Sequence, residues 1–335
     1  MRQARLDTAL HSGALILPEA GRIVVLSPVG GDDLSALPKD RLLVVQGFRP
    51  DHDAFQRQGY AVAVAAEPPF AAALICLPRS RAQGRALVAQ AVALVGAGGL
   101  VLVDGQKTDG IDTMLRDCKA RVVVEGPVVK AHGRLFWFHA AGGFADWAAL
   151  ADPVRIDGGF LTGAGVFSAG HVDDGSAALA AALPPKLGSK VADLGAGWGY
   201  LSAEILKRPT VNVLHLVEAD HLALELARQN ITDPRARFHW ADAASFRPPH
   251  KLDAVVMNPP FHQGRDADPA LGVAFIRAAA AMLAPGGVLW MVANRHLPYQ
   301  ATLDAAFREV AVLASPPGFR IFRASRPVHE SRKPG

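Results

Sequence analysis

The sequence has little cysteine and almost no excess of charge of either sign. Cys76 and Cys118 are the two cysteines among 335 residues, and they are too few and too far apart for a disulfide framework or a zinc site. The net charge of +4 is divided evenly, with 16 Lys/Arg against 14 Asp/Glu in residues 1–150 and 19 against 17 in residues 151–335. No basic tail or stripe by itself predicts a nucleic-acid interface.

Long apolar runs are also missing. No stretch of the sequence approaches the roughly 18 apolar residues that span a membrane. The first 21 residues lack the apolar core of a signal peptide. We therefore expect a soluble, cytoplasmic protein with no membrane or metal partner, and the sequence does not predict its oligomeric state.

The length predicts two domains, because single cores seldom grow beyond about 250–300 residues. Residues 140–165 are rich in glycine and weakly patterned, which is typical of a connector. We place the two domains at residues 1–150 and 151–335.

The first domain alternates strand-like and helix-like segments, which is the pattern of an α/β layer fold. Apolar residues at helical spacing predict a helix over residues 79–96. Runs rich in β-branched residues that stop at Gly or Pro predict strands at 22–28, 41–47, 60–66, 72–78, 99–105 and 121–126.

The two halves of the chain are similar enough to indicate an internal duplication. Residues 73–85 can be aligned with 254–265, and residues 94–106 with 282–294, in the same order. The alignment places residues 77–80, Leu-Pro-Arg-Ser, where the second half has Asn-Pro-Pro-Phe. No segment of the first half matches the glycine-rich loop of the second. We infer that the first domain keeps the fold without the chemistry.

The second domain has the clearest pattern of strands alternating with helices. Helices are predicted at 200–208, 221–230, 268–287 and 298–307. Strands are predicted at 190–194, 211–220, 235–245, 254–257, 288–294, 309–315 and 319–325, the last two forming a hairpin. We expect a seven-stranded, doubly wound and mostly parallel sheet.

A glycine-rich turn follows the first of these strands. Gly195, Gly197 and Gly199 stand at alternate positions, which lets the backbone turn tightly and approach a ligand closely. The dinucleotide fingerprint G-x-G-x-x-G would place its third glycine at Tyr200. The spacing therefore favours a nucleoside ligand other than a dinucleotide.

Three acids, Asp193, Glu218 and Asp242, each close one of three successive predicted strands. Glu218, at the end of the second strand, can accept hydrogen bonds from both ribose hydroxyls. Asp242, at the end of the third strand, can meet an adenine amino group. Asp193 would repel a pyrophosphate but attract an ammonium group. A ligand with an adenosine and a positively charged amino acid end fits best, which predicts S-adenosylmethionine as the cofactor.

The apolar run 254–257 stops at Asn258-Pro259-Pro260-Phe261. Two consecutive prolines cannot donate to a strand ladder, and they stiffen the backbone. Asn258 and Phe261 are therefore expected on a rigid turn at the carboxyl end of a strand, where open α/β sheets bind ligands. A carboxamide, two carbonyls and an aromatic ring suit a flat substrate that carries an amino group.

These motifs resemble the class I methyltransferases of the ribosomal small-subunit RNA guanine-N2 type, the RsmC-like family. The resemblance is carried by VADLGAGWG, the acid Glu218, MNPPFHQG and PGGVLWMVANRHLPY, preceded by GVFSAGHVDDGSAAL and closed by FRIFRAS. It is dense over residues 160–326 and faint over 1–150. One departure is Ala196, where the family usually has a cysteine or similar small residue in the glycine loop.

The resemblance implies two tandem Rossmann-like methyltransferase domains. In that arrangement, residues 1–150 form a degenerate copy that serves RNA recognition or structural support, and residues 151–335 form the catalytic domain. The implied reaction transfers a methyl group from S-adenosylmethionine to the N2 amine of a guanine in 16S ribosomal RNA, within the small subunit.

The resemblance also implies roles for single residues. The Asn258 side-chain oxygen and the Pro259 carbonyl would accept the two N–H bonds of the amine, Pro260 would stiffen the turn, and Phe261 would stack on the base after it leaves its helix or loop. The expected cofactor contacts are Phe167, Ser168, Asp173, Asp193, Gly195, Ala196, Gly197, Gly199, Glu218, Ala219, Asp242, Ala243 and Asn258.

Several alternatives stay open on the sequence. The motif does not exclude the same reaction on large-subunit RNA, and related Asn-Pro-Pro motifs serve adenine-N6 and protein glutamine methylation. A nicotinamide-dependent oxidoreductase is disfavoured by the glycine spacing. A non-catalytic scaffold that binds adenosylmethionine or RNA is disfavoured by the intact Asn258 and Phe261.

Overall fold

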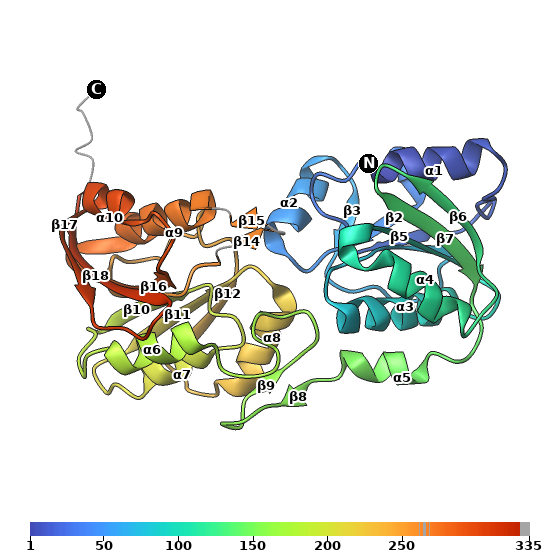
Figure 1. The fold of residues 1–335 in the computed structure, drawn as a ribbon. Coiled ribbons are helices and arrows are strands. Elements are labelled where there is room, and N and C mark those ends of the chain that lie inside the picture. Colours follow the sequence, from blue (N-terminus) through green and yellow to red (C-terminus); the bar gives the residue numbers. More distant parts are fainter. Residues whose placement is uncertain (261, 264–265, 268, 329–335) are drawn as a thin grey trace. The chain divides into compact units, whose positions relative to one another are not determined.

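The computed structural model describes residues 1–260, 262–263, 266–267 and 269–328. The chain divides into two compact units, each with its own sheet (Figure 1). The first unit comprises Met1–Pro153 with Gly163–Gly165, and the second comprises Val154–Thr162 and the chain from Val166 onward. The chain therefore first passes from one unit to the other after Pro153, three residues beyond the boundary expected at residue 150.

The sheet of the second unit has the order β12-β11-β10-β13-β16-β18-β17 among the described residues. Five neighbouring strands are parallel, and β18 is antiparallel to both β16 and β17. The predicted carboxyl-terminal hairpin is therefore confirmed. The strands are β10 (Lys190–Leu194), β11 (Val213–Glu218), β12 (Ala236–Trp240), β13 (Leu252–Met257), β16 (Leu283–Asn294), β17 (Phe307–Leu313) and β18 (Phe319–Pro327).

Helices cover both faces of this sheet, as a doubly wound fold requires. One apolar cluster joins the sheet to α6, α7 and α8, and another joins the opposite face to α9 and α10. The helices are α6 (Asp174–Ala182), α7 (Tyr200–Leu206), α8 (His221–Asn230), α9 (Pro269–Met282) and α10 (Gln300–Ala306). Two short ladders complete the unit, β8 (Val154–Arg155) with β9 (Leu161–Thr162) and β14 (His262–Gln263) with β15 (Asp266–Ala267).

The sheet of the first unit has the same arrangement, β3-β2-β1-β4-β5-β7-β6 in the described part of the chain. The expected tandem of two α/β domains is confirmed by this shared strand order. The strands are β1 (Ile23–Leu26), β2 (Leu42–Val45), β3 (Ala61–Ala63), β4 (Ala72–Cys76), β5 (Leu100–Gln106), β6 (Glu125–Lys130) and β7 (Gly133–His139). The sequence patterns did not predict β7, and the strand predicted at 121–126 lies four residues later, at β6.

The helical segments of the first unit lie on both faces of its sheet. The apolar cluster on one face includes residues of α3, α4 and α5, and the cluster on the other includes residues of α1 and α2. The segments are α1 (Arg2–His11), α2 (Arg49–Arg57), α3 (Arg81–Val95), α4 (Ile111–Lys119) and α5 (Ala145–Ala148), with 3-10 turns η1 (Lys39–Arg41), η2 (Lys107–Asp109) and η3 (Ala149–Ala151). Both cysteines are buried free thiols.

The strand registers show which residues of the two sheets occupy corresponding positions. Leu26 and Leu194 end the central strands β1 and β10, and the next amide, Ser27 or Gly195, donates to a carbonyl of the neighbouring strand at 2.9 or 2.8 Å. On the other side of the central strand, Leu26 is paired with Ile75 of β4, and Leu194 is paired with Met257 of β13. Cys76, and not Leu77, therefore occupies the position of Asn258.

The register corrects one expectation. The alignment that placed Leu77 on Asn258 is shifted by one residue, because it followed the likeness of apolar runs, which carry no register of their own. The first unit also has a turn in the place of the glycine-rich loop, at residues 27–31, with Gly30 and Gly31 in it.

The first unit carries a buried ion cluster beneath the carboxyl end of its sheet. The carboxylate of Asp104, on β5, is fully buried and accepts hydrogen bonds from Arg5 Nε at 2.6 Å and Nη2 at 2.7 Å. Arg2 Nη1 donates to the same carboxylate at 2.5 Å. Both arginines belong to α1, which precedes β1 as α6 precedes β10.

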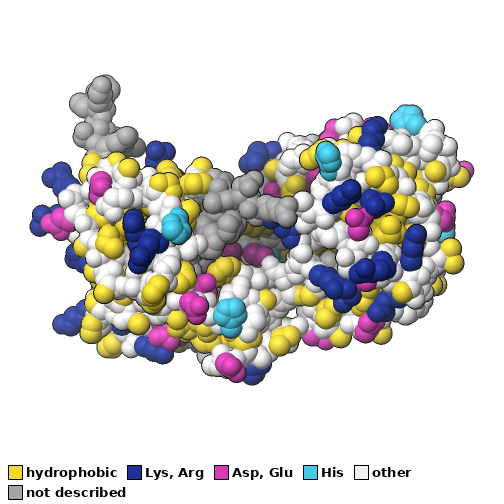
Figure 2. Space-filling model, in the orientation of Figure 1, with side chains coloured by type: hydrophobic (Ala, Val, Ile, Leu, Met, Phe, Trp, Pro, Cys, Tyr) yellow, Lys and Arg dark blue, Asp and Glu magenta, His cyan; other side chains and the backbone are white. Residues whose placement is uncertain are grey.

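Surface charge is mixed on both units. Figure 2 shows basic and acidic side chains interspersed over the visible face of each. Within the described ranges, no helix combines the length and the apolar character needed to cross a membrane.

Candidate active site

The glycine-rich turn lies between β10 and α7, at the carboxyl edge of the second sheet. Gly195, Gly197 and Gly199 have φ values of 75°, 54° and 97°, in the left-handed region that favours glycine. The amides of Gly195 and Ala196 donate to the carbonyl of Val217 at 2.8 and 3.1 Å, which fixes the turn to β11. The spacing of the glycines is thus required by the backbone conformation.

Glu218, at the end of β11, holds this turn through its carboxylate. Oε2 accepts a hydrogen bond from Gly197 N at 2.7 Å, and Oε1 accepts one from Asp220 N at 2.8 Å. Burial raises the pKa of Glu218, while the amides of Asp220 and Gly197 act in the opposite direction. Each oxygen retains further lone pairs, since a carboxylate offers about four acceptor sites.

Asp193 is fully buried beneath the turn. Its Oδ2 accepts a hydrogen bond from Ser202 Oγ at 2.7 Å, and its Oδ1 has no partner among the described residues. Burial raises the pKa of Asp193 to about 7, with a smaller contribution in the same direction from Glu218 and an opposing one from Ser202. An unpartnered buried carboxylate oxygen is costly and is suited to a cationic ligand.

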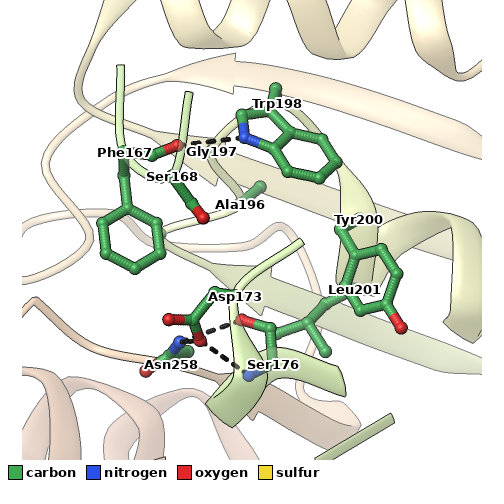
Figure 3. A pocket seen from close by; sticks show the side chains of 11 residues that line it. Phe167, Ser168, Asp173, Ser176, Ala196, Gly197, Trp198, Tyr200, Leu201 and Asn258 are labelled. Carbon is green, nitrogen blue, oxygen red and sulfur yellow. Dashed lines mark hydrogen bonds between the residues drawn. The ribbon is translucent and has the colours of Figure 1, made fainter. Parts of the chain in front are cut away.

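Asn258 follows β13, next to the turn, and its amide group is held by α6. Its Nδ2 donates to Asp173 Oδ2 and to Ser176 Oγ, both at 2.9 Å. Figure 3 shows the amide nitrogen facing these two side chains and the amide oxygen directed away from them. Asp173 Oδ2 also accepts a hydrogen bond from Ser176 N at 2.8 Å, so Asp173 caps α6.

The rest of the Asn-Pro-Pro-Phe motif is described only in part. Pro259 is buried and Pro260 is exposed. Phe261, predicted to stack on the base, lies outside the described residues.

Two further expected cofactor contacts precede α6. The ring of Phe167 is 56% exposed, which leaves its surface available at the mouth of the cleft. The Phe167 carbonyl accepts a hydrogen bond from Trp198 Nε1 at 3.0 Å. Ser168 has a φ of 51° and donates from Oγ to the carbonyl of His171 at 2.6 Å. The segment before α6 is therefore fixed to the glycine turn.

Expected contacts around β11 and β12 lie in neighbouring turns. The Ala219 carbonyl accepts a hydrogen bond from Trp240 Nε1 at 2.9 Å. Asp242 follows β12, and its Oδ1 accepts a hydrogen bond from Ala244 N at 2.9 Å. Ala243 is buried in the core.

Residues from the central part of the site line a small cleft (Figure 3). Its enclosed space is about 40 Å³, far below the 300–1,000 Å³ of typical ligand pockets, so a nucleoside ligand would extend beyond it. The cleft is lined by Phe167, Ser168, Asp173, Ser176, Gly195, Ala196, Gly197, Trp198, Tyr200, Leu201 and Asn258. The expected residues outside this lining are Asp193, Gly199, Glu218, Ala219, Asp242, Ala243, Pro259 and Pro260.

Four lining residues were not predicted from the sequence, namely Ser176, Trp198, Tyr200 and Leu201. Three of them lie within or directly after the glycine turn, so proximity to that motif was a usable signal. Ser176 lies in no such motif, and its contact with Asn258 spans 82 residues of sequence.

The fold and the site define the chain as having a class I methyltransferase architecture, present twice. A family model described as "Methyltransferase small domain" matches residues 157–323. A solved structure from T. thermophilus, a 16S rRNA N2 guanine methyltransferase in complex with AdoMet and guanosine, matches with a TM-score of 0.79 and 24% identity. That match covers 97% of this chain and 91% of the other, and it shows a shared fold across both units.

Comparison with curated relatives identifies the methyltransferase family to which the chain belongs. The chain is 32% identical to ribosomal RNA small subunit methyltransferase C of Pseudomonas aeruginosa over 269 residues, 77% of this chain and 80% of the relative. It is 34% identical to ribosomal RNA large subunit methyltransferase G of Alcanivorax borkumensis over 213 residues. That match covers 60% of this chain and spans about half of the relative, at 53% of its length. The chain belongs to the family of ribosomal RNA small subunit methyltransferase C proteins.

Proposed function

We propose that this protein transfers a methyl group from S-adenosylmethionine to the exocyclic N2 amine of a guanine in 16S ribosomal RNA. The observation that supports this most directly is the Asn258 amide, whose nitrogen is held by Asp173 and Ser176 beside the glycine turn. The amide oxygen is then left to accept a hydrogen bond. An aromatic amine is a substrate that can donate one.

The residues around the turn fit the cofactor. Asp193 provides an unpartnered buried carboxylate oxygen for the ammonium group, and Glu218 provides acceptor sites for the ribose hydroxyls. Asp242, which lies in the turn after β12, is the acid that we propose for the adenine amino group. Because the enclosed space is small, the adenosine would lie along the open carboxyl edge of the sheet. When bound, S-adenosylmethionine supplies the electrophilic methyl carbon of a sulfonium.

The chain itself contributes alignment rather than a strong base. An aromatic amine is a poor nucleophile, because its lone pair is delocalised into the ring. Asn258 Oδ1 and the Pro259 carbonyl accept its two N–H bonds and turn the lone pair out of the ring plane. The nitrogen becomes acidic once it is alkylated, so the proton can pass to water. Alignment of this kind can supply roughly 7–11 kcal/mol of a barrier.

The small subunit is the preferred target because the relative that aligns over 80% of its length is a small-subunit enzyme. A ribosomal substrate implies that the protein works in the cytoplasm. The second candidate is the same reaction on large-subunit RNA, which is favoured by the 34% identity to a large-subunit enzyme over 213 residues.

The test is incubation of the protein with tritiated S-adenosylmethionine and separated ribosomal subunits, followed by nucleoside analysis of the labelled RNA. We expect N2-methylguanosine in 16S RNA. Label in 23S RNA alone would favour the second candidate. Label in N6-methyladenosine or in protein, or no label in any fraction, would contradict the proposal.

We further propose that residues 1–150 serve RNA recognition or structural support. They lie in a unit with its own sheet and its own apolar clusters. A chain that begins at Val154 is expected to bind S-adenosylmethionine within about twofold of the full chain, because the site residues all lie in the second unit. Its apparent affinity for ribosomal RNA should fall about tenfold or more.

Calorimetry and filter binding measure the two affinities of that truncated chain. Circular dichroism serves as the control for folding. Undiminished methylation of RNA by the truncated chain would contradict a recognition role for the first unit.

A further inference from the structure

We propose that Asp173, assisted by Ser176, is a positioning residue that sets the amide orientation of Asn258, and is not a cofactor contact as the sequence suggested. This inference rests on the proposed function, and it adds a reason why the site takes an amine. The orientation makes Asn258 an acceptor towards the substrate. A site of this polarity selects a group that donates hydrogen bonds and disfavours a carbonyl.

The chemistry of the two partners fixes the orientation. An ionised carboxylate can only accept hydrogen bonds, so Asp173 Oδ2 requires the Asn258 NH₂ group at 2.9 Å. Ser176 Oγ accepts from the same nitrogen at 2.9 Å. A flipped amide would place its oxygen against the carboxylate, where two acceptors repel. Hydrogen bonds to a charged acceptor are about twice as strong as neutral ones, which favours the observed orientation.

The carboxylate is itself held by the start of α6. Ser176 N donates to Asp173 Oδ2 at 2.8 Å, so one oxygen serves both as helix cap and as anchor for Asn258. The capped turn is part of a helix whose Leu179 is fully buried against the sheet. Movement of the Asp173 carboxylate therefore requires movement of the first turn of α6.

Gly175 shows how closely this turn is packed. A Cβ at Gly175 would lie 2.9 Å from Phe319 Cε1, on β18, and 3.1 Å from Asp173 Oδ2. No real Cβ approaches an atom that closely, so a side chain there must displace the Phe319 ring or the carboxylate. The backbone of Gly175 does not have a left-handed φ, and alanine favours helices. Gly175→Ala consequently perturbs the packing without straining the backbone.

Asp173→Ser is the central test variant. Serine is also a good helix cap, but its shorter side chain cannot take the place of the carboxylate against Asn258. We expect kcat to fall roughly tenfold to a hundredfold, the range associated with a small misplacement of a reacting group. The Kd for S-adenosylmethionine should stay within about twofold, and the Tm should stay close to that of the unchanged protein.

The control is Asp253→Ser. Asp253 Oδ2 likewise accepts two hydrogen bonds, from Ser189 N at 2.8 Å and Lys190 N at 2.9 Å. It lies at the start of β13, at the opposite end of the strand from Asn258. This variant loses a comparable pair of bonds, and its kcat is expected to be unchanged.

Gly175→Ala is the second test variant, because it retains every polar group of the site. We expect a fall in kcat in the same direction as for Asp173→Ser, again without loss of cofactor affinity. If kcat and cofactor affinity of Asp173→Ser fall together, Asp173 is a cofactor contact and the inference is wrong. Full turnover by Asp173→Ser would equally overturn it.

A spectroscopic readout separates this inference from the proposed function. The side-chain NH₂ signals of Asn258, assigned by their loss in Asn258→Asp, should shift in Asp173→Ser and not in Asp253→Ser. This measurement does not require RNA. Absence of methylation by the unchanged protein would remove the proposed function, whereas unshifted NH₂ signals would remove the positioning role.

Discussion

Asn258→Ala is expected to reduce kcat for RNA methylation by roughly 10²–10³-fold, the loss seen when one aligned hydrogen-bonding group is removed from an active site. The variant lacks the Oδ1 that would accept from the substrate amine, and the lone pair of that amine is no longer turned towards the methyl carbon. Single-turnover methylation of ribosomal RNA measures the chemical step directly.

Cofactor affinity distinguishes the roles of Asn258. In the described contacts its amide nitrogen bonds to Asp173 and Ser176, so its removal should change the Kd for S-adenosylmethionine by no more than about threefold. Calorimetry on Asn258→Ala and on the unchanged protein gives this comparison. Equal losses of turnover and cofactor affinity would show that Asn258 acts mainly as a cofactor contact.

The first unit shows what the same fold looks like when these groups are replaced. Strand register places Cys76 where the second unit has Asn258. Burial raises the pKa of the Cys76 thiol to about 12, so it stays a weak hydrogen-bonding group. Cys76 is also paired in register with Asp104, whose carboxylate is bound by Arg2 and Arg5. The position of Asn258 is thus occupied by a buried thiol that lies beside a closed ion cluster.

A second replacement lies at the neighbouring strand. Gln46 follows β2 as Glu218 closes β11, and its Oε1 accepts a hydrogen bond from Phe48 N at 2.7 Å, two residues on, as Glu218 accepts from Asp220. Its Nε2 donates to the Pro28 carbonyl at 2.5 Å. An amide used in this way offers less acceptor capacity than a carboxylate. We infer that the first unit retains the framework of a nucleoside site without its binding groups.

Most strand positions could be predicted from the sequence because the buried strands are short apolar runs, several of which end at Gly or Pro. The same rule failed at β6, where Gly126 and Pro127 lie inside a strand and not at its end. β6 is the edge strand of its sheet, where proline is tolerated. The positions of Gly and Pro therefore predict the ends of central strands better than the ends of edge strands.

The site was predictable where one motif supplies the residues and less so where distant segments meet. The glycine turn and Asn258 were each found from local sequence. The bond between Asn258 and Asp173 joins residues 85 positions apart, and no spacing rule indicates it. Asp173 could be recognised as an acid before a helix, but its partner required the register that brings α6 to the end of β13.

Asp193→Asn is expected to stabilise the ligand-free protein above pH 7. Because burial raises its folded-state pKa to about 7, the contribution of this carboxyl to stability is fully present below its ordinary value near 3.8 and is lost as the pH rises through about 7. At 1.36 kcal/mol per pKa unit, the cost of the buried charge at pH 8 is at most about 4 kcal/mol. Asparagine lacks that charge, so the difference between the two proteins should vanish below about pH 4. Urea denaturation at pH 4, 6 and 8 measures it.

The same substitution is expected to weaken binding of S-adenosylmethionine, since the unpartnered Oδ1 is the group proposed to meet its ammonium. For the unchanged protein, affinity should tighten as the pH rises through 7 and the carboxyl ionises. For Asp193→Asn, affinity should be about tenfold weaker at pH 7.5 and should lack the pH dependence near 7 that the ionisation of Asp193 gives the unchanged protein. A variant that gains stability and keeps full cofactor affinity would show that the buried charge serves neither folding nor binding. A gain in stability joined to a loss of affinity would show that the fold tolerates an unfavourable charge in order to bind a cation.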